Sequence, residues 1–193
     1  NILIDEGLSS LSNLTGIGQH GYNIYKHLGL YCEREITNYW MLKYVPRVLR
    51  RFLYVGITNF HLFYKKFDII HYQNQNVPFT KGRSKKVVTI HDLGVFRYPE
   101  TIPTFYVKYN QLSIKNSIKR TDAIITPSKF TKNEILYYFP NIDEQKINVC
   151  EPGLRDIFFK KNINSDVLQK NDLLSNSYFF FLGSLSRRKN LQF

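Results

Sequence analysis

The sequence predicts an α/β fold in which a parallel β-sheet is flanked by helices. Three observations predict it. Apolar, strand-like runs alternate with stretches of helical periodicity, two of the runs end in a glycine turn that opens a helix, and 43% of the residues are hydrophobic. Such alternation is typical of parallel βαβ units. The 193 residues leave room for one domain of ordinary size and a short further segment.

The amino-terminal strand is predicted at Ile2–Asp5, where a short apolar run opens the chain. A long loop, Glu6–Thr15, follows it, and loops of that length are often functional. The first helix is indicated by residues at helical spacing, namely Ile17, Gly21, Ile24, Tyr25 and Leu28.

Four further strands are predicted where short apolar runs precede turn signals, at Asp68–Tyr72, Val87–His91, Ala123–Thr126 and Ile147–Cys150. A helix is predicted over Thr104–Lys119, with Phe105, Tyr109 and Leu112 on one face. Ser128 stands where an N-cap would be, because its hydroxyl can accept a hydrogen bond from a free backbone N–H. The helix that it opens should end near Pro140.

The stretch Val45–Lys66 combines bulky apolar residues with flanking Arg and Lys, and it has two interpretations. A helix of this kind can lie in an anionic membrane interface. The alternative is a pair of core helices whose basic residues are solvated, and Gly56 and Asn59 favour it because they interrupt the pattern. No apolar stretch reaches the roughly 20 residues needed to span a bilayer.

The sequence divides into three parts. Residues 1–152 form the first α/β domain, residues 153–177 form a polar and irregular connection, and residues 178–193 begin a second domain with a strand in YFFFLG. A lone strand cannot bury both of its faces. The native fold is therefore expected to need residues beyond Phe193.

The formal net charge of +12 favours anionic partners such as phosphorylated ligands, acidic lipid or nucleic acid. A nucleic-acid binder is disfavoured, because the aromatic residues lie inside apolar strand and helix patterns and form no stacking motif. The two cysteines, Cys32 and Cys150, have no metal-site spacing and form no disulfide framework, which favours a reducing, cytoplasmic setting.

The first glycine turn, Thr15-Gly16-Ile17-Gly18, lies at a strand-to-helix junction. Backbone N–H groups at such a turn can approach a phosphate, and the helix amino terminus adds positive potential. The turn is not the dinucleotide-binding fingerprint, which needs a third glycine. It is therefore either an anion site or a plain tight turn.

His91 and Asp92 stand directly at the carboxyl end of a predicted buried strand. In open parallel sheets, ligands bind beyond the carboxyl ends of strands, where a histidine can bond a sugar hydroxyl or a phosphate oxygen. His91 could equally be a strand-end residue satisfied by Asp92 or a loop carbonyl. His71 has a similar position, so sequence alone does not choose between them; His20, His27 and His61 are given no role.

The run Arg187-Arg188-Lys189 follows Gly183 in the second copy of the strand–glycine device. Its cations would neutralise a diphosphate as negative charge develops. Solvation is the usual role of such a run, but the preceding strand and glycine favour the functional one. There is no DxD pair and no cluster with metal-ligand spacing, so we predict no metal and no cofactor.

Five stretches together resemble, in the same order, segments of family-four glycosyltransferases, which have the GT-B fold of two facing Rossmann-like domains. They are LTGIGQHGYNIYKHL, VVTIHDLGVFRYPE, DAIITPSKFTKNEI, KINVCEPGLRDIF and FFFLGSLSRRKNL. The resemblance implies a Rossmann-like amino-terminal half of a GT-B fold with a truncated second domain. It also implies retaining, metal-independent transfer of a hexose from a nucleotide sugar to a glycan or lipid-linked acceptor, in cell-surface polysaccharide assembly.

The resemblance also implies roles for particular residues. Glycine amides of the first loop contact the donor diphosphate in such enzymes, which matches Gly16 and Gly18. The histidine of the His-Asp-Leu turn touches the transferred sugar, which matches His91. The Arg-Lys of the phosphate loop neutralises the leaving diphosphate, which matches Arg188 and Lys189.

Two residues beside these positions, Thr15 and Asp92, are assigned to the sugar or the acceptor. Members of the family with an arginine directly after the loop glycine differ from this sequence, where Ser184 follows Gly183. That difference makes the diphosphate more dependent on Arg188 and Lys189.

The family's glutamate pair and its pocket for base and ribose lie further into the second domain, so this chain alone is expected to be nearly inactive. The alternative to an enzyme is a non-catalytic module, left by truncation, that binds an acceptor or partner. The expected location is cytoplasmic, with peripheral contact to an anionic membrane left open.

Overall fold

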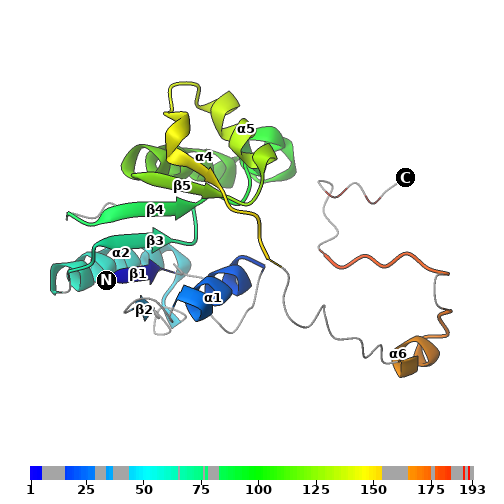
Figure 1. Cartoon of the computed structure of the whole chain (residues 1–193). Coiled ribbons are helices and arrows are strands. Elements are labelled where there is room, and N and C mark those ends of the chain that lie inside the picture. Colours follow the sequence, from blue (N-terminus) through cyan, green and yellow to red (C-terminus); the bar gives the residue numbers. More distant parts are fainter. Residues whose placement is uncertain are drawn as a thin grey trace. The chain divides into compact units, whose positions relative to one another are not determined.

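The structure is a computed structural model that describes residues 1–5, 16–28, 34–36, 44–64, 66–75, 77, 83–153, 165–174, 177–183, 189 and 191. The chain separates into two compact units, Asn1–Glu151 and Pro152–Phe193 (Figure 1). The predicted identity of each domain is not tested by this division and stays a prediction.

The first unit is built on a six-stranded sheet in the order β2-β1-β3-β4-β5-β6, and every neighbouring pair is parallel. This confirms the predicted α/β class with a Rossmann-like parallel sheet. The strands are β1 (Ile2–Asp5), β2 (Arg34–Ile36), β3 (Ile69–Tyr72), β4 (Lys85–Thr89), β5 (Ala123–Thr126) and β6 (Ile147–Val149).

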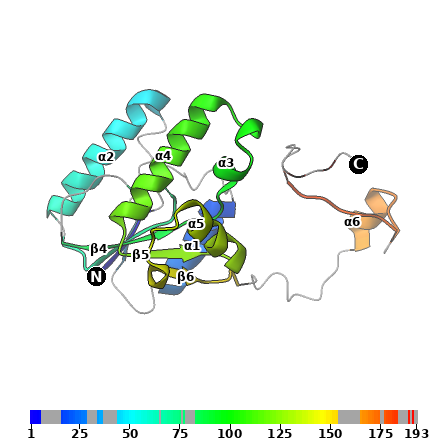
Figure 2. The ribbon, with the colours of Figure 1, turned by 90° about the horizontal axis from the view of Figure 1, so that it is seen from above.

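Helices cover both faces of the sheet. In the first unit they are α1 (Gly16–Leu28), α2 (Arg47–Tyr64), α3 (Gly94–Arg97), α4 (Thr104–Arg120) and α5 (Lys129–Tyr138), with 3-10 turns η2 (Pro99–Thr101) and η3 (Glu144–Lys146). α2 and α4 lie side by side on one face, and α1 covers the other (Figures 1 and 2). The short α3 is tied to both later helices, because Gln111 Nε2 on α4 donates to the Val95 carbonyl and Arg97 pairs with Glu134 on α5.

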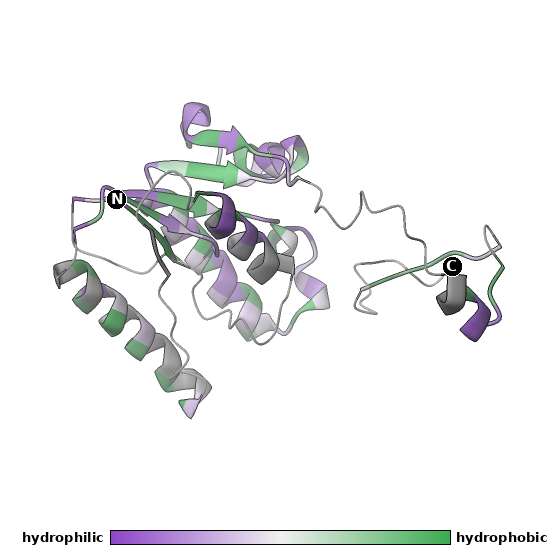
Figure 3. Ribbon diagram, turned by 60° about the horizontal axis from the view of Figure 1, so that its bottom comes forward, coloured by the Kyte–Doolittle hydropathy of each residue, from purple (hydrophilic) through white to green (hydrophobic). Residues whose placement is uncertain are grey.

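The core lies along the central strands, which are mostly hydrophobic in Figure 3. Leu3, Val88 and Ile124 come from three of these strands and are fully buried. Ile114 of α4 and Ile135 of α5 are equally buried and pack against the same cluster. Strands that are covered on both faces need continuous apolar runs, and this is why the sequence signals them clearly.

α4 shows which of its faces the sheet uses. Its buried residues are Val107, Ser113, Ile114, Ser117 and Ile118. Phe105 and Leu112, which the sequence places on one face, are 77% and 60% exposed. The helix was predicted correctly, but the face marked by these two apolar residues points to solvent rather than to the core.

The N-cap of α5 is confirmed. The Ser128 side chain accepts a hydrogen bond from the Thr131 backbone N–H at 3.2 Å. Ser128→Ala should lower the free energy of unfolding by about 1 kcal/mol, because it leaves that N–H without its acceptor. Urea unfolding followed by circular dichroism measures the change. Ser128→Asn keeps a capping oxygen and should stay near wild type; an equal loss in both variants would argue against the cap.

Three differences from the predicted elements have local causes. β2 has three residues (REI), of which Ile36 alone is apolar, so it gave no apolar run. β4 spans Lys85–Thr89 rather than Val87–His91 because Lys85 and Lys86 pair with Ile69 and Ile70 of β3. In the second unit, the connection contains α6 (Ser165–Lys170), and the described residues 177–183 form no strand.

The absent strand in YFFFLG has a simple physical reason. Phe179 and Phe180 are fully or largely exposed, and no sheet partner for this segment is present among the described residues. A strand needs a neighbour to satisfy its backbone N–H and C=O groups. In the described part of the chain, no helix combines the length and the apolar character that crossing a bilayer requires.

Candidate functional site

The order of the strands defines where a ligand is expected. β1 pairs with β2 on one side and with β3 on the other. The connection from β1 to β2 therefore runs toward one edge of the sheet, and the strands from β3 onward are added toward the other edge. Open α/β sheets bind ligands outside the carboxyl ends of their strands at such a switch point. The residues that follow β3 and β4, together with the beginning of α1, are therefore the candidates.

α1 begins at Gly16, and no acidic residue stands in its first turn. The first N–H groups of a helix have no partner within it, and they carry the positive end of the helix dipole. A Cβ atom at Gly21 would lie 3.3 Å from Cγ of Gln73, the residue directly after β3. Glycine at this position therefore lets α1 approach the end of β3 closely.

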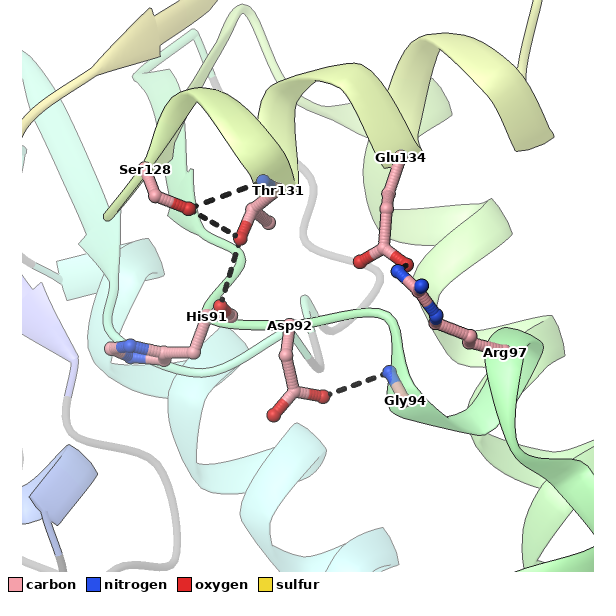
Figure 4. A network of polar contacts seen from close by, with 7 residues as sticks. All are labelled: His91, Asp92, Gly94, Arg97, Ser128, Thr131 and Glu134. Carbon is pink, nitrogen blue, oxygen red and sulfur yellow. Dashed lines mark hydrogen bonds and ion pairs between the residues drawn. The ribbon is translucent and has the colours of Figure 1, made fainter. Parts of the chain in front are cut away.

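His91 lies two residues beyond β4 and is partly buried. Its Nε2 is 3.2 Å from the Gln73 carbonyl oxygen. Because a carbonyl only accepts, Nε2 carries the proton in this contact. The backbone carbonyl of His91 accepts a hydrogen bond from Thr131 Oγ1 at 3.3 Å, which ties the residue to α5 (Figure 4). Two elements thus hold His91 in place.

Burial lowers the pKa of His91 below its ordinary value, and the hydrogen bond to the Gln73 carbonyl and the charge of Asp92 offset this effect in part. The imidazole is therefore mainly neutral at pH 7. In that state the Nε2–H is engaged by the Gln73 carbonyl and Nδ1 is left as an acceptor, which suits a ligand hydroxyl.

A contact between two rings joins His91 to α1. The His20 and His91 rings lie edge to face, with centroids 5.3 Å apart and an interplanar angle of 82°. His20 is on the helix that Gly16 opens. The structure therefore brings α1, the helix that opens at Gly16, into contact with His91, while the binding of an anion there stays a prediction.

His20 was given no role from the sequence, although one signal was available. Helical side chains point back toward the amino terminus, so a residue at i+4 lies over the turn that begins at i. His20 is four residues after Gly16. Helical spacing alone could have placed it over the first turn, but only the fold shows that His91 meets it there.

His71 on β3 proves to be a structural residue. It is 6% exposed, its Nε2 lies 2.9 Å from Thr89 Oγ1, and its Nδ1 lies 3.1 Å from Gln73 Nε2. Burial, followed by the charges of His20 and His91, lowers the pKa of His71 to about 4. This neutral, bonded histidine supports the Gln73 side chain, and the predicted role of His91 toward a ligand stays a prediction.

Asp92 is exposed, and its Oδ1 accepts a hydrogen bond from the Gly94 backbone N–H at 2.9 Å (Figure 4). The carboxylate thus stabilises the turn that opens α3. This contact does not test the predicted role of Asp92 in binding sugar or acceptor, which stays a prediction.

The remaining predicted site residues are placed less completely. Gly16 and Gly18 lie in the first turn of α1, while Thr15 and Arg188 fall outside the described residues. Lys189 is exposed and belongs to the second unit. Their contacts with a donor stay predictions.

A metal centre is not formed by the residues that the structure describes. Among them, no group of three or more His, Cys, Asp and Glu side chains is arranged to hold a metal ion. Metal independence itself stays a prediction.

Comparison with known proteins identifies the family. Residues 12–156 match the family described as Glycosyltransferase Family 4. The chain belongs to Glycosyltransferase Family 4. Both α1 and His91, the two parts of the candidate site, lie within the matched region.

A similar curated protein is the O-antigen chain mannosyltransferase B of Escherichia coli, which is 29% identical over 123 residues. The aligned region is 63% of this family-four chain and 32% of that relative. The chain thus spans about a third of the length of the relative that it matches.

Proposed function

We propose that this protein is a hexosyltransferase that moves a sugar from a nucleotide-sugar donor to a glycan or lipid-linked acceptor in cell-surface polysaccharide assembly. Membership of Glycosyltransferase Family 4 and the similarity to a mannosyltransferase support the proposal. The proposal includes three further points: the anomeric configuration of the sugar is retained, the enzyme binds the donor without a dedicated metal ion, and it uses no cofactor.

The proposal assigns a task to each part of the site. The amides of Gly16 and Gly18 and the positive end of α1 bind the donor diphosphate, and His91 touches the transferred sugar. Arg188 and Lys189 neutralise the diphosphate as it leaves. For the residues of the first unit, the observation that supports this assignment is the contact of His20 with His91, because it joins α1 to the segment that follows β4.

A transfer assay tests the proposal. The complete gene product is incubated with a panel of sugar nucleotides and lipid-linked glycan acceptors, with EDTA present, and nucleoside diphosphate release and product mass are followed. We expect release that depends on the acceptor and a product whose anomeric configuration, read by NMR, is that of the donor. Absence of transfer with every pair would refute the enzyme, and inversion or rescue only by added metal would refute those parts.

We also propose that the protein is cytoplasmic and contacts the inner, anionic face of the membrane through α2. Four apolar residues of α2 are exposed at successive spacings of four, four and three: Leu49 (55%), Leu53 (45%), Ile57 (37%) and Phe60 (65%). These spacings put them on one face of the helix, which we call the α2 stripe. Figure 3 shows hydrophobic residues recurring along α2.

The sequence-based objection to this helix does not hold. α2 continues through Gly56 and Asn59 from Arg47 to Tyr64, and a Cβ atom at Gly56 would meet nothing within 4 Å. Tyr54 and Thr58 are buried, so α2 uses another face for the core and exposes the stripe. Three arginines in the first half of α2, together with the net charge of +12, suit an anionic surface.

Vesicle sedimentation tests the membrane contact. The double variant Leu53→Ser, Phe60→Ser should bind anionic vesicles about 10-fold more weakly or worse, because each side chain loses apolar area that would leave water. Tyr137→Ser, which changes an exposed aromatic residue on α5, should bind like wild type. Equal binding of the protein to neutral vesicles would contradict electrostatic docking.

A further inference from the structure

We propose that His20 is a second ligand-contacting residue of the site, so that His20 and His91 act as a pair on the diphosphate of the donor. The inference rests on the proposed function, since the diphosphate is the anion that a nucleotide sugar brings. It adds His20 to the residues that contact the ligand. It also implies that one of the two imidazoles becomes protonated when the anion binds.

The hydrogen bonding of the histidines separates His20 from the others. In the part of the chain that the structure describes, no hydrogen bond reaches either ring nitrogen of His20, although the residue is partly buried. His71 is bonded at both nitrogens, and His27 on the same helix bonds the Asn23 carbonyl through Nδ1. Among the described residues, the buried side-chain atoms that lack a partner do not include the ring nitrogens of His20, so these nitrogens are open to water and to a ligand.

The position of His20 on α1 favours an anion as that ligand. His20 follows the first turn of α1, where unpaired N–H groups and the helix dipole attract negative charge. His20 also contacts the ring of His91, the residue proposed to meet the sugar. An anion at the beginning of α1 would therefore lie within reach of two imidazoles.

The charges around the two histidines explain why one of them should be protonated only when an anion binds. Burial lowers the pKa of His20, and the charge that His91 would carry lowers it further. The other titratable groups that act on the pair from the described elements are His71, which is held neutral on β3, and Asp92 after β4. A proton on one ring is repelled by a proton on the other, and a bound dianion offsets this repulsion.

The first experiment uses the full chain with ¹⁵N-labelled histidine, titrated with inorganic pyrophosphate in EDTA and followed by NMR. The ring signals of His20 and His91 should shift, and those of His27 and His71 should not. His20→Gln should weaken pyrophosphate binding about 10-fold or more, since it removes a hydrogen bond to a charged group. His27→Gln is the matched control on the same helix and should bind like wild type.

The second experiment measures how the affinity for an anion depends on pH. A merely structural role of His20 would not change this dependence. Sulfate replaces pyrophosphate, because sulfate does not titrate near neutral pH. Its affinity for the wild type should rise as the pH falls from 8 to 6, and the rise should be much smaller in His20→Gln. His91→Gln should raise the pKa of His20 toward its ordinary value, because the neighbouring charge is gone.

The outcomes separate this inference from the proposed function. Unchanged pyrophosphate affinity in a folded His20→Gln, or ring signals of His20 that do not move, would overturn the role of His20 and leave the transferase proposal standing. Loss of the pH dependence in His27→Gln would also overturn it. Intact pyrophosphate binding in a complete gene product that transfers no sugar would instead refute the transferase and keep His20 as an anion ligand.

Discussion

Replacing His91 with glutamine should reduce kcat/KM for sugar transfer by about 100-fold or more, which is the usual cost of removing one polar contact to a developing charge in a transition state. The imidazole is fixed by the Gln73 carbonyl and, through its own backbone, by Thr131. A glutamine has a different shape and cannot present a ring nitrogen at the same place. The rate is measured on the complete gene product with its best sugar nucleotide.

The control for this variant is His27→Gln, which changes an exposed histidine of α1 and should keep the wild-type rate. Thermal unfolding of His91→Gln should show a folded protein, since the ring is only partly buried and Thr131 bonds the backbone carbonyl. A folded His91→Gln protein with nearly wild-type kcat/KM would remove His91 from the proposed chemistry. Loss of rate in both variants would show that the effect is not specific to the site.

Acid should destabilise the first unit through His71. The pKa of this residue is about 4 in the folded protein, whereas an unperturbed histidine has a pKa of 6.5. Below pH 6.5 the unfolded chain binds a proton that the buried ring does not, so the unfolded state gains stability as the pH falls. The loss should reach about 2 kcal/mol at pH 5 and about 3 kcal/mol below pH 4.

Urea unfolding at several pH values, followed by circular dichroism, measures this loss. His71→Gln removes the titrating group and should flatten the decline in the free energy of unfolding between pH 7 and pH 5. The residual slope would belong to the remaining groups, including His20 and His91, whose pKa values are also lowered. A slope equal to that of the wild type would show that His71 is protonated in the folded protein as readily as in the unfolded chain.

The buried elements could be predicted from the sequence because their signals are local. β1, β3 and β5 are apolar runs covered on both faces, and Ser128 caps α5 as its position indicated. β2 could not be predicted in this way, because Ile36 is the one apolar residue among its three and, among the described strands, β2 pairs with β1 alone. A short strand of that kind is stabilised by its neighbour rather than by its own composition.

The YFFFLG segment shows the opposite error. Its composition is that of a strand, yet Phe179 and Leu182 are exposed and the described residues around them are not paired. Intrinsic preference does not make a strand without a partner to accept its hydrogen bonds.

The candidate site was predictable in part. The glycine turn and the histidine after a buried strand each suggested ligand binding, and the structure brings α1 and His91 together. The choice between His71 and His91 was not available, because both stand near the ends of strands. The structure distinguishes the two residues by their contacts, because Thr89 and Gln73 bond His71, which is buried and neutral.

The sequence by itself determined the α/β class, the strand–turn–helix order, the positive charge, and the placement of Gly16 at the start of a helix and of His91 close to the end of a strand. These follow from periodicity and from residue types within short windows, because residues close in sequence determine the local structure there. Only the tertiary structure decided that His20 meets His91, that His71 is structural and that the α2 stripe faces solvent. Each of these depends on contacts between residues distant in sequence, which the order of the strands and the packing of α1 and α2 create.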